Sequence, residues 1–572
     1  MSSPRRSRKK HRPSLLSRRE FLRRGGYASL ALAAPVLPSC SNDGDRTSNT
    51  LAGTPLETVF LHGIASGDPL SDRVILWTRV TPPAGMSSVP GSVKVYQEPG
   101  LTTLVGSMDF SASAARDFTV KLDFTGLRPG TAYYYRFEAL GFQSVIGRTR
   151  TAPAAGVSRL RFGVVSCSSY AHGYFNAYSH LAKRADMDAV LHLGDYIYEY
   201  GTGEYGDVRE YEPPHEILTL DDYRTRHAQY RRDADLREAH RQHPFITVWD
   251  DHETANNAWR DGADNHTEGA EGAWVQRKAW AIQAYYEWLP IRQADPGNAE
   301  RIYRAFHYGD LADLVMLDTR IIDRDLQAGL LDAAAINDEA RKLLGPAQLA
   351  WLSEQLGAPG ATWRLLGQQV MFGQLRIPSL PELSALSGIP IEQLQTLLQS
   401  LPLVSTGGLM INTDQWDGYR AERARLFELF ESLPAVNAVV LTGDIHTSWC
   451  MDLSRDPANP LVYSPLTGSG SLGVEFVCTS ITSPGLEQLN PLVPVLQLVN
   501  PHMKYVDLAQ KGYLLLDITP ERLVGEHWYI DTIAESGGGE SFGAAYAVDA
   551  GARHLVAAEQ TEARADAPPL AP

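Results

Sequence analysis

Cysteine is scarce in this sequence, and its scarcity excludes a scaffold framed by disulfides. Four cysteines, Cys40, Cys167, Cys450 and Cys478, are spread over 572 residues, whereas disulfide-framed proteins place several in a short chain. Long apolar runs are lacking as well. Beyond residue 60, no stretch approaches the roughly 20 apolar residues that cross a bilayer as a helix. The sequence therefore excludes a transmembrane body.

Basic residues are in short supply outside the N-terminus. Residues 1–39 hold ten Lys or Arg and one acid, which leaves the rest of the chain with a net charge of −24. Such a body repels the backbone of nucleic acids, so we expect no stable nucleic-acid partner. A protein with this charge needs metal ions or a few well-placed arginines to bind an anion.

The basic N-terminus is followed by a short apolar run over 27–37, which is the layout of a signal peptide. Arg18 and Arg19 resemble the paired arginines of a twin-arginine signal, which exports folded proteins. The segment ends at Cys40 in a pattern similar to a lipoprotein cleavage site, so lipidation and ordinary cleavage nearby are both open. We predict a twin-arginine signal peptide over 1–40, export by the twin-arginine translocase, and a periplasmic or secreted protein.

Two different sequence patterns follow the predicted signal peptide and its linker. Residues 41–57 are polar and predict a flexible linker, and short alternating strands over 58–152 are typical of a small β-sandwich of immunoglobulin or fibronectin type. Over 158–530 buried strands alternate with helices, which predicts an α/β domain with its site at the carboxyl ends of the strands. Helices are expected over 221–241, 269–288, 346–356 and 419–433. An insertion is expected near 373–415, and a disordered tail over 551–572.

Four of the predicted strands end in side chains that suit a metal site. In chain order these ends are Ser166-Cys167-Ser168, Gly194-Asp195-Tyr196-Ile197-Tyr198, Trp249-Asp250-Asp251-His252-Glu253 with Asn256 following, and Gly443-Asp444-Ile445-His446. One Gly-Asp after a strand is often only a cap, but four such ends in one domain favour a shared site. Asp195 and Tyr198 are three residues apart, so carboxylate and phenol can face one ion. A metal also deprotonates a thiol such as Cys167.

These motifs resemble the calcineurin-like metallophosphatases and, among them, the PhoD family of alkaline phosphatases and phosphodiesterases. The resemblance covers 58 to about 530 and implies a β-sandwich flanked by helices (α/β/β/α) that follows the small all-β domain. It implies Fe³⁺ and Ca²⁺ as cofactors, with other divalent metals open. The implied metal ligands are Cys167, Asp195, Tyr198, Asn256, Asp444, His446 and, from a strand end whose exact ligand is open, Asp251. The implied catalytic residues are Asp195, Asn256, His252 and His446, with Arg277 as a clamp on the phosphate.

We therefore expect an exported hydrolase of phosphoric esters, acting as a monomer, in which a metal-activated hydroxide attacks phosphorus. A dedicated phosphodiesterase on cell-wall polymers, nucleic acids or phospholipids is the enzymatic alternative. A surface-binding protein without metal, working through its β-sandwich, is the non-enzymatic alternative. At the residue level, Tyr198 could be a core aromatic, Cys167 an inert thiol, His252 an organiser of its loop, and Arg277 a surface residue of a helix.

Overall fold

The computed structural model describes residues 58–329, 332–398, 412–433 and 437–572. The predicted signal peptide, linker and lipidation site at Cys40 lie outside these residues and stay predictions. Within the described residues, no helix is both long enough and apolar enough to cross a membrane.

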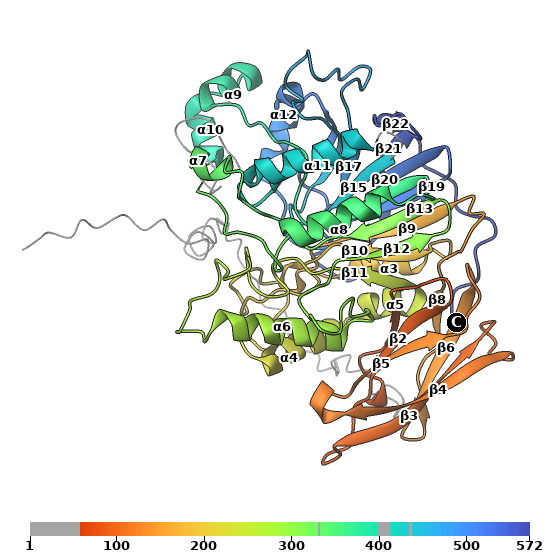
Figure 1. Cartoon of the computed structure of the whole chain (residues 1–572). Helices are drawn as coiled ribbons and strands as arrows, with labels where there is room; N and C mark the ends of the chain where they lie inside the picture. Colours follow the sequence, from red (N-terminus) through yellow and green to blue (C-terminus); the bar gives the residue numbers. More distant parts are fainter. Residues whose placement is uncertain (1–57, 330–331, 399–411, 434–436) are drawn as a thin grey trace, which may run out of the picture.

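A ten-stranded sheet forms the first of two central layers (Figure 1). Its order is β22-β21-β20-β19-β9-β10-β11-β1-β2-β5. The strands are β1 (Ile64–Gly67), β2 (Arg73–Arg79), β5 (Thr119–Thr125), β9 (Leu160–Val165), β10 (Ala189–His192), β11 (Pro244–Thr247), β19 (Gly512–Ile518), β20 (Arg522–Ile530), β21 (Glu540–Asp549) and β22 (Val556–Ala558). β9, β10 and β11 run parallel and are buried throughout, as apolar strands covered on both faces must be. Their carboxyl ends therefore lie at one edge.

A seven-stranded sheet forms the second layer, in the order β12-β13-β14-β15-β17-β16-β18. Its strands are β12 (Arg304–Tyr308), β13 (Ala312–Met316), β14 (Trp363–Gly367), β15 (Asn437–Thr442), β16 (Ser448–Leu453), β17 (Gly473–Val477) and β18 (Met503–Asp507). β13, β14, β15 and β17 are parallel neighbours, so this sheet also presents several carboxyl ends at one edge.

The two sheets share one hydrophobic core, to which Val164 and Phe245 contribute from the first sheet and Leu365 and Leu441 from the second. Helices cover the outer faces, with α3 and α5 beside the ten-stranded sheet and α8 and α11 over the other (Figure 1). The helices are α3 (Asn176–Ala182), α4 (Leu220–Tyr230), α5 (Ala234–Gln242), α6 (Trp274–Trp288), α7 (Ala333–Ile336), α8 (Gly345–Gly357), α9 (Leu380–Ser387), α10 (Ile391–Leu398), α11 (Arg420–Ser432) and α12 (Val493–Val499). Short 3₁₀ turns are η1 (Ala114–Arg116), η2 (Tyr170–His172), η3 (Trp416–Gly418) and η4 (Glu487–Leu492). The predicted α/β class is thus observed.

The N-terminal layer is less independent than the sequence indicated. A five-stranded sheet is built from β3 (Ser88–Tyr96), β4 (Leu104–Ser113), β6 (Ala132–Ala139), β7 (Phe142–Gln143) and β8 (Gly147–Arg150). It packs on β1, β2 and β5 around a shared core that includes Val74, Val93 and Tyr135. However, β1 pairs in parallel with β11, so half of the expected small sandwich belongs to the central sheet. The boundary predicted near 152 therefore does not separate two independent bodies, because β1, β2 and β5 precede it and lie in the same sheet as β9.

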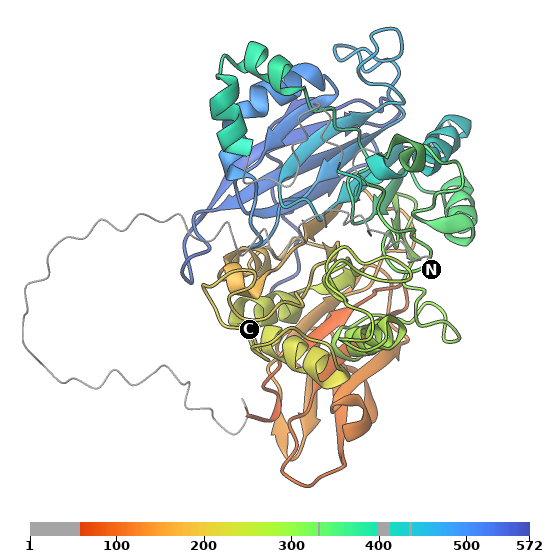
Figure 2. The same cartoon turned by 90° about the vertical axis from the view of Figure 1, so that its left-hand side faces the viewer.

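The prediction of a disordered tail over 551–572 is wrong. β22 adds a strand to the end of the ten-stranded sheet, and the chain then runs on to the N-terminal layer, where both views place the C-terminus (Figures 1 and 2). Thr561 N–H donates to Glu526 over 2.8 Å, and Ala571 N–H donates to the Gln242 side chain over 2.9 Å. The Ala-, Glu- and Pro-rich composition suggested disorder, but these long-range hydrogen bonds hold the backbone in place.

Candidate metal centre

The candidate ligands lie on loops that leave the parallel strands of both sheets. Cys167 follows β9, Asp195 follows β10, and Asp444 and His446 follow β15; their φ angles are 60°, 57°, 60° and 63°. This left-handed conformation costs a residue with a Cβ atom roughly 1–2 kcal/mol, and it is concentrated at functional sites. Cys167 N–H donates to the Gly194 carbonyl over 3.1 Å, which joins the ends of β9 and β10.

One group of donors combines sulfur, nitrogen and oxygen. Cys167, Asp195 and His446 each offer one ligand atom, and these three atoms lie within 4.8 Å of one another. The Tyr198 hydroxyl donates to Asp195 Oδ2 over 2.8 Å and lies 3.4 Å from His446 Nε2. Ser483 is also bonded to this hydroxyl, at 2.6 Å. The predicted Cys167, Asp195, Tyr198 and His446 are therefore brought together.

Two further groups are rich in carboxylates. Asp195, Asp251 and His252 form one, and Asp250, Asp251 and Asp444 form the other, each again within 4.8 Å. Asp195 belongs to two of the three groups and so does Asp251, so the groups make one continuous centre. Asp444 and His446 are partly exposed, whereas the other members are buried, which means that the centre meets solvent at the loop after β15.

The donor set fits metal ions because its buried carboxylates outnumber the basic side chains beside them. Asp195 Oδ1 and Asp250 Oδ2 are buried without a hydrogen-bond partner in the part of the chain that the structure describes. Burial raises the pKa of Asp195, Cys167 and Tyr198 well above their ordinary values, and neighbouring acids raise it further. Bound cations reverse this preference, since they stabilise the carboxylate, thiolate and phenolate forms. Carboxylate oxygens suit calcium, and the mixed group suits a transition metal.

Arg320 is a residue of this centre that the sequence analysis missed. It lies in the loop after β13, is completely buried, and donates to Asp250, to Asp444 (2.5 Å) and to both oxygens of Asp414 (2.9 Å). Asp318-Thr319-Arg320 is a polar strand end like the other four, so the same pattern could have identified it. Gln415, on the segment predicted as an insertion, also donates to Asp444.

Comparison with known proteins decides the family. Residues 162–526 match the PhoD-like phosphatase family, and residues 46–153 match the PhoD-like phosphatase N-terminal domain. The chain belongs to the PhoD-like phosphatase family. Alkaline phosphatase D from Bacillus subtilis (strain 168) is 36% identical over 541 residues, which cover 91% of this chain and 85% of that protein. A solved structure of PhoD superposes with a TM-score of 0.77 at 34% identity and covers 90% of this chain and 95% of that one.

Membership of the PhoD-like phosphatase family makes this chain a phosphoric ester hydrolase, and the family suggests dependence on metals. The resemblance read from the strand-end motifs is thereby confirmed.

Two buried glutamates hold the loops of this PhoD-like centre in shape. Glu253 accepts from the backbone N–H groups of Asp195 (3.0 Å), Tyr196 (2.6 Å) and Asp250 (2.8 Å), which joins the ends of β10 and β11. Burial raises the pKa of Glu253 to about 7, although these N–H groups favour its charged form. The sequence placed Glu253 in a motif without giving it a role.

Glu199 organises the predicted residues His252 and Asn256. Its carboxylate lies 2.7 Å from His252 Nδ1 and accepts from Asn256 N–H over 2.8 Å. The His252 ring stacks on Tyr198 with 4.2 Å between centroids. Burial opposes the charged imidazolium, but Asp251, Glu199 and Asp195 raise the pKa of His252 to about 10. His252 therefore both orders its loop and belongs to a candidate metal group.

Arg277 is placed differently from the expected phosphate clamp. It is 1% exposed on α6, and its guanidinium donates to Glu216 (2.9 Å), the Tyr223 hydroxyl (3.1 Å) and the Asn265 carbonyl (2.9 Å). Arg277 is therefore not a surface residue of its helix, which was the alternative to the clamp in the sequence analysis. In this arrangement its donors face protein groups, so the clamp role stays a prediction.

Proposed function

We propose that this chain hydrolyses phosphate monoesters and diesters at the centre formed by the strand-end loops, with Fe³⁺ and Ca²⁺ as its metals. The observation that supports the proposal most is the arrangement of the three donor groups. Asp195 and Asp251 each belong to two of these groups, and the groups contain buried carboxylate oxygens without a hydrogen-bond partner among the described residues. The groups lie within a chain of the PhoD-like phosphatase family.

The donor chemistry supports one assignment for each metal. Cys167, Tyr198, His446 and Asp195 would hold the iron, because a hard trivalent ion binds phenolate and carboxylate well and also deprotonates a thiol. Asp250, Asp251, Asp444 and the neighbouring Asn256 would hold calcium, which prefers oxygen ligands. When bound, the metals supply positive charge that polarises the phosphate and activates water.

The chain's own residues would hold the metals and orient the side chains that surround the ester. Asp195 would lie between the two metal sites, since it belongs to the group proposed for iron and to a second group with Asp251, which in turn belongs to the group proposed for calcium. His446 and Asp444 stand on the side that meets solvent, where the ester enters. Glu199 holds the His252 ring through Nδ1, which leaves Nε2 for a ligand or phosphate oxygen. The buried guanidinium of Arg320 neutralises part of the negative charge of Asp250 and Asp444, so that the centre does not depend on metals alone for positive charge.

The proposal is tested with Asp195→Asn in the full chain. We expect it to lower the hydrolysis of p-nitrophenyl phosphate and of bis-p-nitrophenyl phosphate by more than about 100-fold, because even an outer-shell partner of a metal ligand is worth 10–100-fold. The matched control is Asp261→Asn, whose side chain is 66% exposed and paired with Arg260. Hydrolysis that survives Asp195→Asn at the control level would contradict the proposed centre.

We further propose that the enzyme works outside the cytoplasm after export by the twin-arginine translocase. The support is Arg18-Arg19 before a short apolar run, together with a centre that would take up its metals most safely during folding inside the cell. Arg18-Arg19→Lys-Lys should leave active enzyme in the cytoplasm with its N-terminal segment attached. Unchanged export of that double variant, measured by fractionation, would contradict this proposal.

A further inference from the structure

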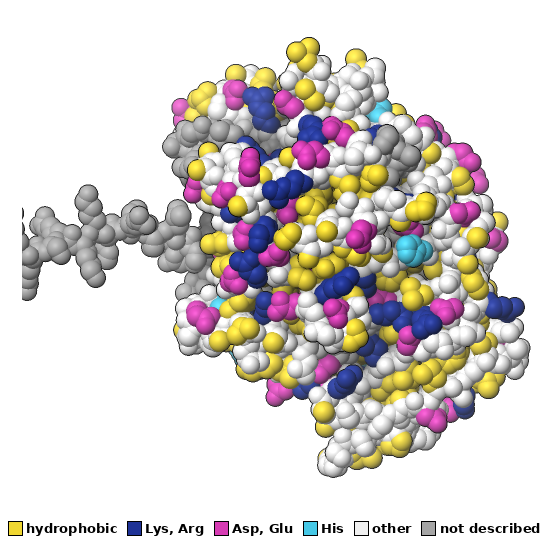
Figure 3. All heavy atoms as spheres, viewed as in Figure 1, with side chains coloured by type: hydrophobic (Ala, Val, Ile, Leu, Met, Phe, Trp, Pro, Cys, Tyr) yellow, Lys and Arg dark blue, Asp and Glu magenta, His cyan; other side chains and the backbone are white. Residues whose placement is uncertain are grey.

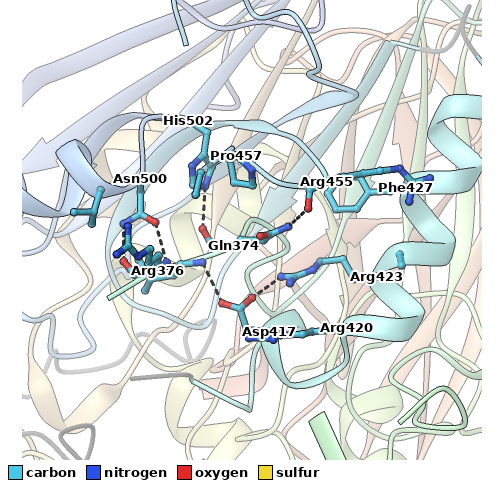
Figure 4. A pocket seen from close by; sticks show the side chains of 14 residues that line it. Gln374, Arg376, Asp417, Arg420, Arg423, Phe427, Arg455, Pro457, Asn500 and His502 are labelled. Atoms are coloured by element: carbon cyan, nitrogen blue, oxygen red, sulfur yellow. Dashed lines mark hydrogen bonds and ion pairs between the residues drawn. The ribbon is translucent and has the colours of Figure 1, made fainter. Parts of the chain in front are cut away.

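A cavity of about 370 Å³ lies beside the turn that leads from η3 into α11 (Figure 4). Its walls come from the segment after β14, from α11, and from the loops after β16 and α12. Every wall is therefore part of the outer layer of helices and loops that covers the seven-stranded sheet. None of the candidate metal groups found among the described residues uses a residue of this cavity.

The walls of the cavity are held in place by hydrogen bonds between the segments. The Asn500 side chain donates to the Arg376 carbonyl over 2.7 Å and accepts from Arg376 N–H over 2.8 Å. The Gln374 side chain donates to the Arg455 carbonyl over 2.7 Å, and the backbone carbonyl of Gln374 lies 2.9 Å from His502 Nε2. Figure 4 shows these contacts converging from separate elements. The cavity is thus a built feature that exists before any ligand arrives.

The cavity is strongly basic in an acidic protein. Arg376, Arg420, Arg423 and Arg455 line it, and Asp417 is the sole carboxylate among its lining residues, whereas the whole chain carries a net charge of −15. Elsewhere, as on the face in Figure 3, Lys and Arg side chains are interspersed with Asp and Glu. A pocket in which one sign of charge dominates attracts counter-ions of the opposite sign.

Several of its polar groups lack protein partners. The Arg423 side chain is 6% exposed and donates through Nη1 to Asp417 and to the Phe372 carbonyl, while its Nε and Nη2 find no hydrogen-bond acceptor in the described chain. Among the same residues, the Arg420 side chain makes neither an ion pair nor a hydrogen bond. His502 is 1% exposed; its Nε2 faces a carbonyl and so carries the proton, which leaves Nδ1 as a buried acceptor without a partner.

The remaining two arginines pair with glutamates at the surface of the protein. Arg376 pairs with Glu382 and Arg455 with Glu431 at the surface, where both members of each pair are about a third exposed or more. Exposed pairs contribute little, but the Arg455–Glu431 pair is bidentate, with bonds of 2.6 and 2.8 Å, and is the firmer of the two. Arg420 has no side-chain partner among the described residues and is therefore the guanidinium group most available to an anion, and Arg376, with a single long contact of 3.3 Å to Glu382, is the next.

We propose that this cavity is a second phosphate-binding site, which holds the dianionic phosphate of orthophosphate or of a phosphomonoester without hydrolysing it. Guanidinium groups present paired N–H donors that match two oxygens of a phosphate, and Arg420 and Arg423 supply them one turn apart on the same helix. Because the cavity contains no candidate metal group, it recognises phosphate without the means to cleave its ester. It differs from the proposed catalytic centre in position, in residues and in chemistry.

The test is equilibrium dialysis of the full-length, metal-loaded enzyme against radiolabelled inorganic phosphate at constant ionic strength. We expect two classes of site, and we expect Arg420→Ala to weaken one of them by about tenfold or more, because a charge-assisted pair of hydrogen bonds is lost. Arg420→Ala should leave unchanged the inhibition constant of phosphate against p-nitrophenyl phosphate hydrolysis, which reports the catalytic centre and also shows that the variant is folded. Arg420→Glu should abolish the second class entirely.

Arg425→Ala is the matched control, because it removes the same charge from the exposed side of the same helix. A single class of site in the wild type, or an equal loss in the Arg425 and Arg420 variants, would overturn the proposal. Methylphosphonate distinguishes the two sources of the ligand. If it displaces phosphate from the second class, the site accepts phosphomonoester ends, and if it does not, the site is specific for orthophosphate.

Discussion

Arg320 is a fully buried cation surrounded by carboxylates. Its guanidinium contacts Asp250, Asp444 and Asp414, which come from three separate segments. A buried charge of this kind is stable only when its partners are all present. The residue therefore joins the loops after β11, β13 and β15 through charge and not through apolar packing.

We predict that Arg320→Met lowers the free energy of unfolding of the metal-free protein by about 3–5 kcal/mol, because it leaves buried carboxylates without their partner. Arg324→Met is the control, since its only carboxylate partner among the described residues is Asp414. Urea denaturation of both variants measures the difference. Equal losses in the two variants would show that Arg320 does not balance the acidic cluster.

Tyr198 offers a spectroscopic test at the same scale. If its phenolate binds Fe³⁺, the loaded protein should absorb visible light through charge transfer, and Tyr198→Phe should remove that band while iron stays bound through Cys167, Asp195 and His446. Tyr205→Phe changes the ring that stacks on Tyr198 at 5.5 Å between centroids and should keep the band. An iron-loaded, active wild type without visible absorption would refute the assignment of Tyr198.

At the scale of elements, the strand-end motifs were read correctly because they depend on short-range pattern alone. Apolar runs followed directly by polar residues located β9, β10, β11 and β15. Parallel pairing brings the ends of β9, β10 and β11 together, whereas the end of β15 comes from the second sheet and reaches them because the two sheets pack on one core. The predicted helix over 221–241 is in fact α4 and α5. The break falls at Asp233, whose side chain accepts from Asp235 N–H and Leu236 N–H and so starts a new helix.

Glu475 on β17 connects several elements and should make stability depend on pH. Its carboxylate accepts from Phe372 N–H (2.9 Å), Gly373 N–H (2.7 Å) and the Thr442 hydroxyl (2.7 Å). Burial outweighs these bonds and raises its pKa from 4.5 to about 7. Between these two pH values the unfolded chain releases a proton that the folded chain keeps, so stability falls as the pH rises.

We predict that, between pH 5 and pH 8, the wild type loses on the order of 3 kcal/mol of unfolding free energy relative to Glu475→Gln, because the variant has no proton to release. Urea denaturation of both proteins at both pH values gives the change in unfolding free energy for each, and the two changes are then compared. Parallel pH dependence in the two proteins would mean that Glu475 is charged in the folded state at both.

At the scale of the whole molecule, contacts between distant parts of the chain were beyond the sequence patterns. The parallel pairing of β1 with β11 joins residues about 180 positions apart, and no periodicity reveals such a partner. The same is true of the C-terminal segment, whose composition is that of a disordered tail. Asp414 and Gln415 likewise reach the centre through tertiary packing, which is why the sequence showed an insertion there but not its contacts.

The C-terminal segment should act as a strap that stabilises the whole molecule. Truncation after Ala558 removes the bonds of Thr561 to Glu526, of Arg564 to Asp188 (3.2 Å), and of the Tyr134 hydroxyl to the Pro569 carbonyl (2.5 Å). We expect the melting temperature to fall by a few degrees, because buried Glu526 loses a partner, while hydrolysis below that temperature continues. Arg564→Ala should give a smaller shift, and an unchanged melting curve for the truncated chain would show that the strap adds no stability.

The central claim is that hydrolysis takes place at metals held by the ends of strands from both sheets. Anomalous X-ray diffraction from crystals of the active full-length enzyme, together with elemental analysis of the same preparation, tests it most directly. We expect an iron signal beside Cys167, Tyr198 and His446, and a calcium site bounded by Asp251 and Asp444, with Asp195 between them. Full activity in a preparation without metals, or metals bound away from Asp195, would contradict the account.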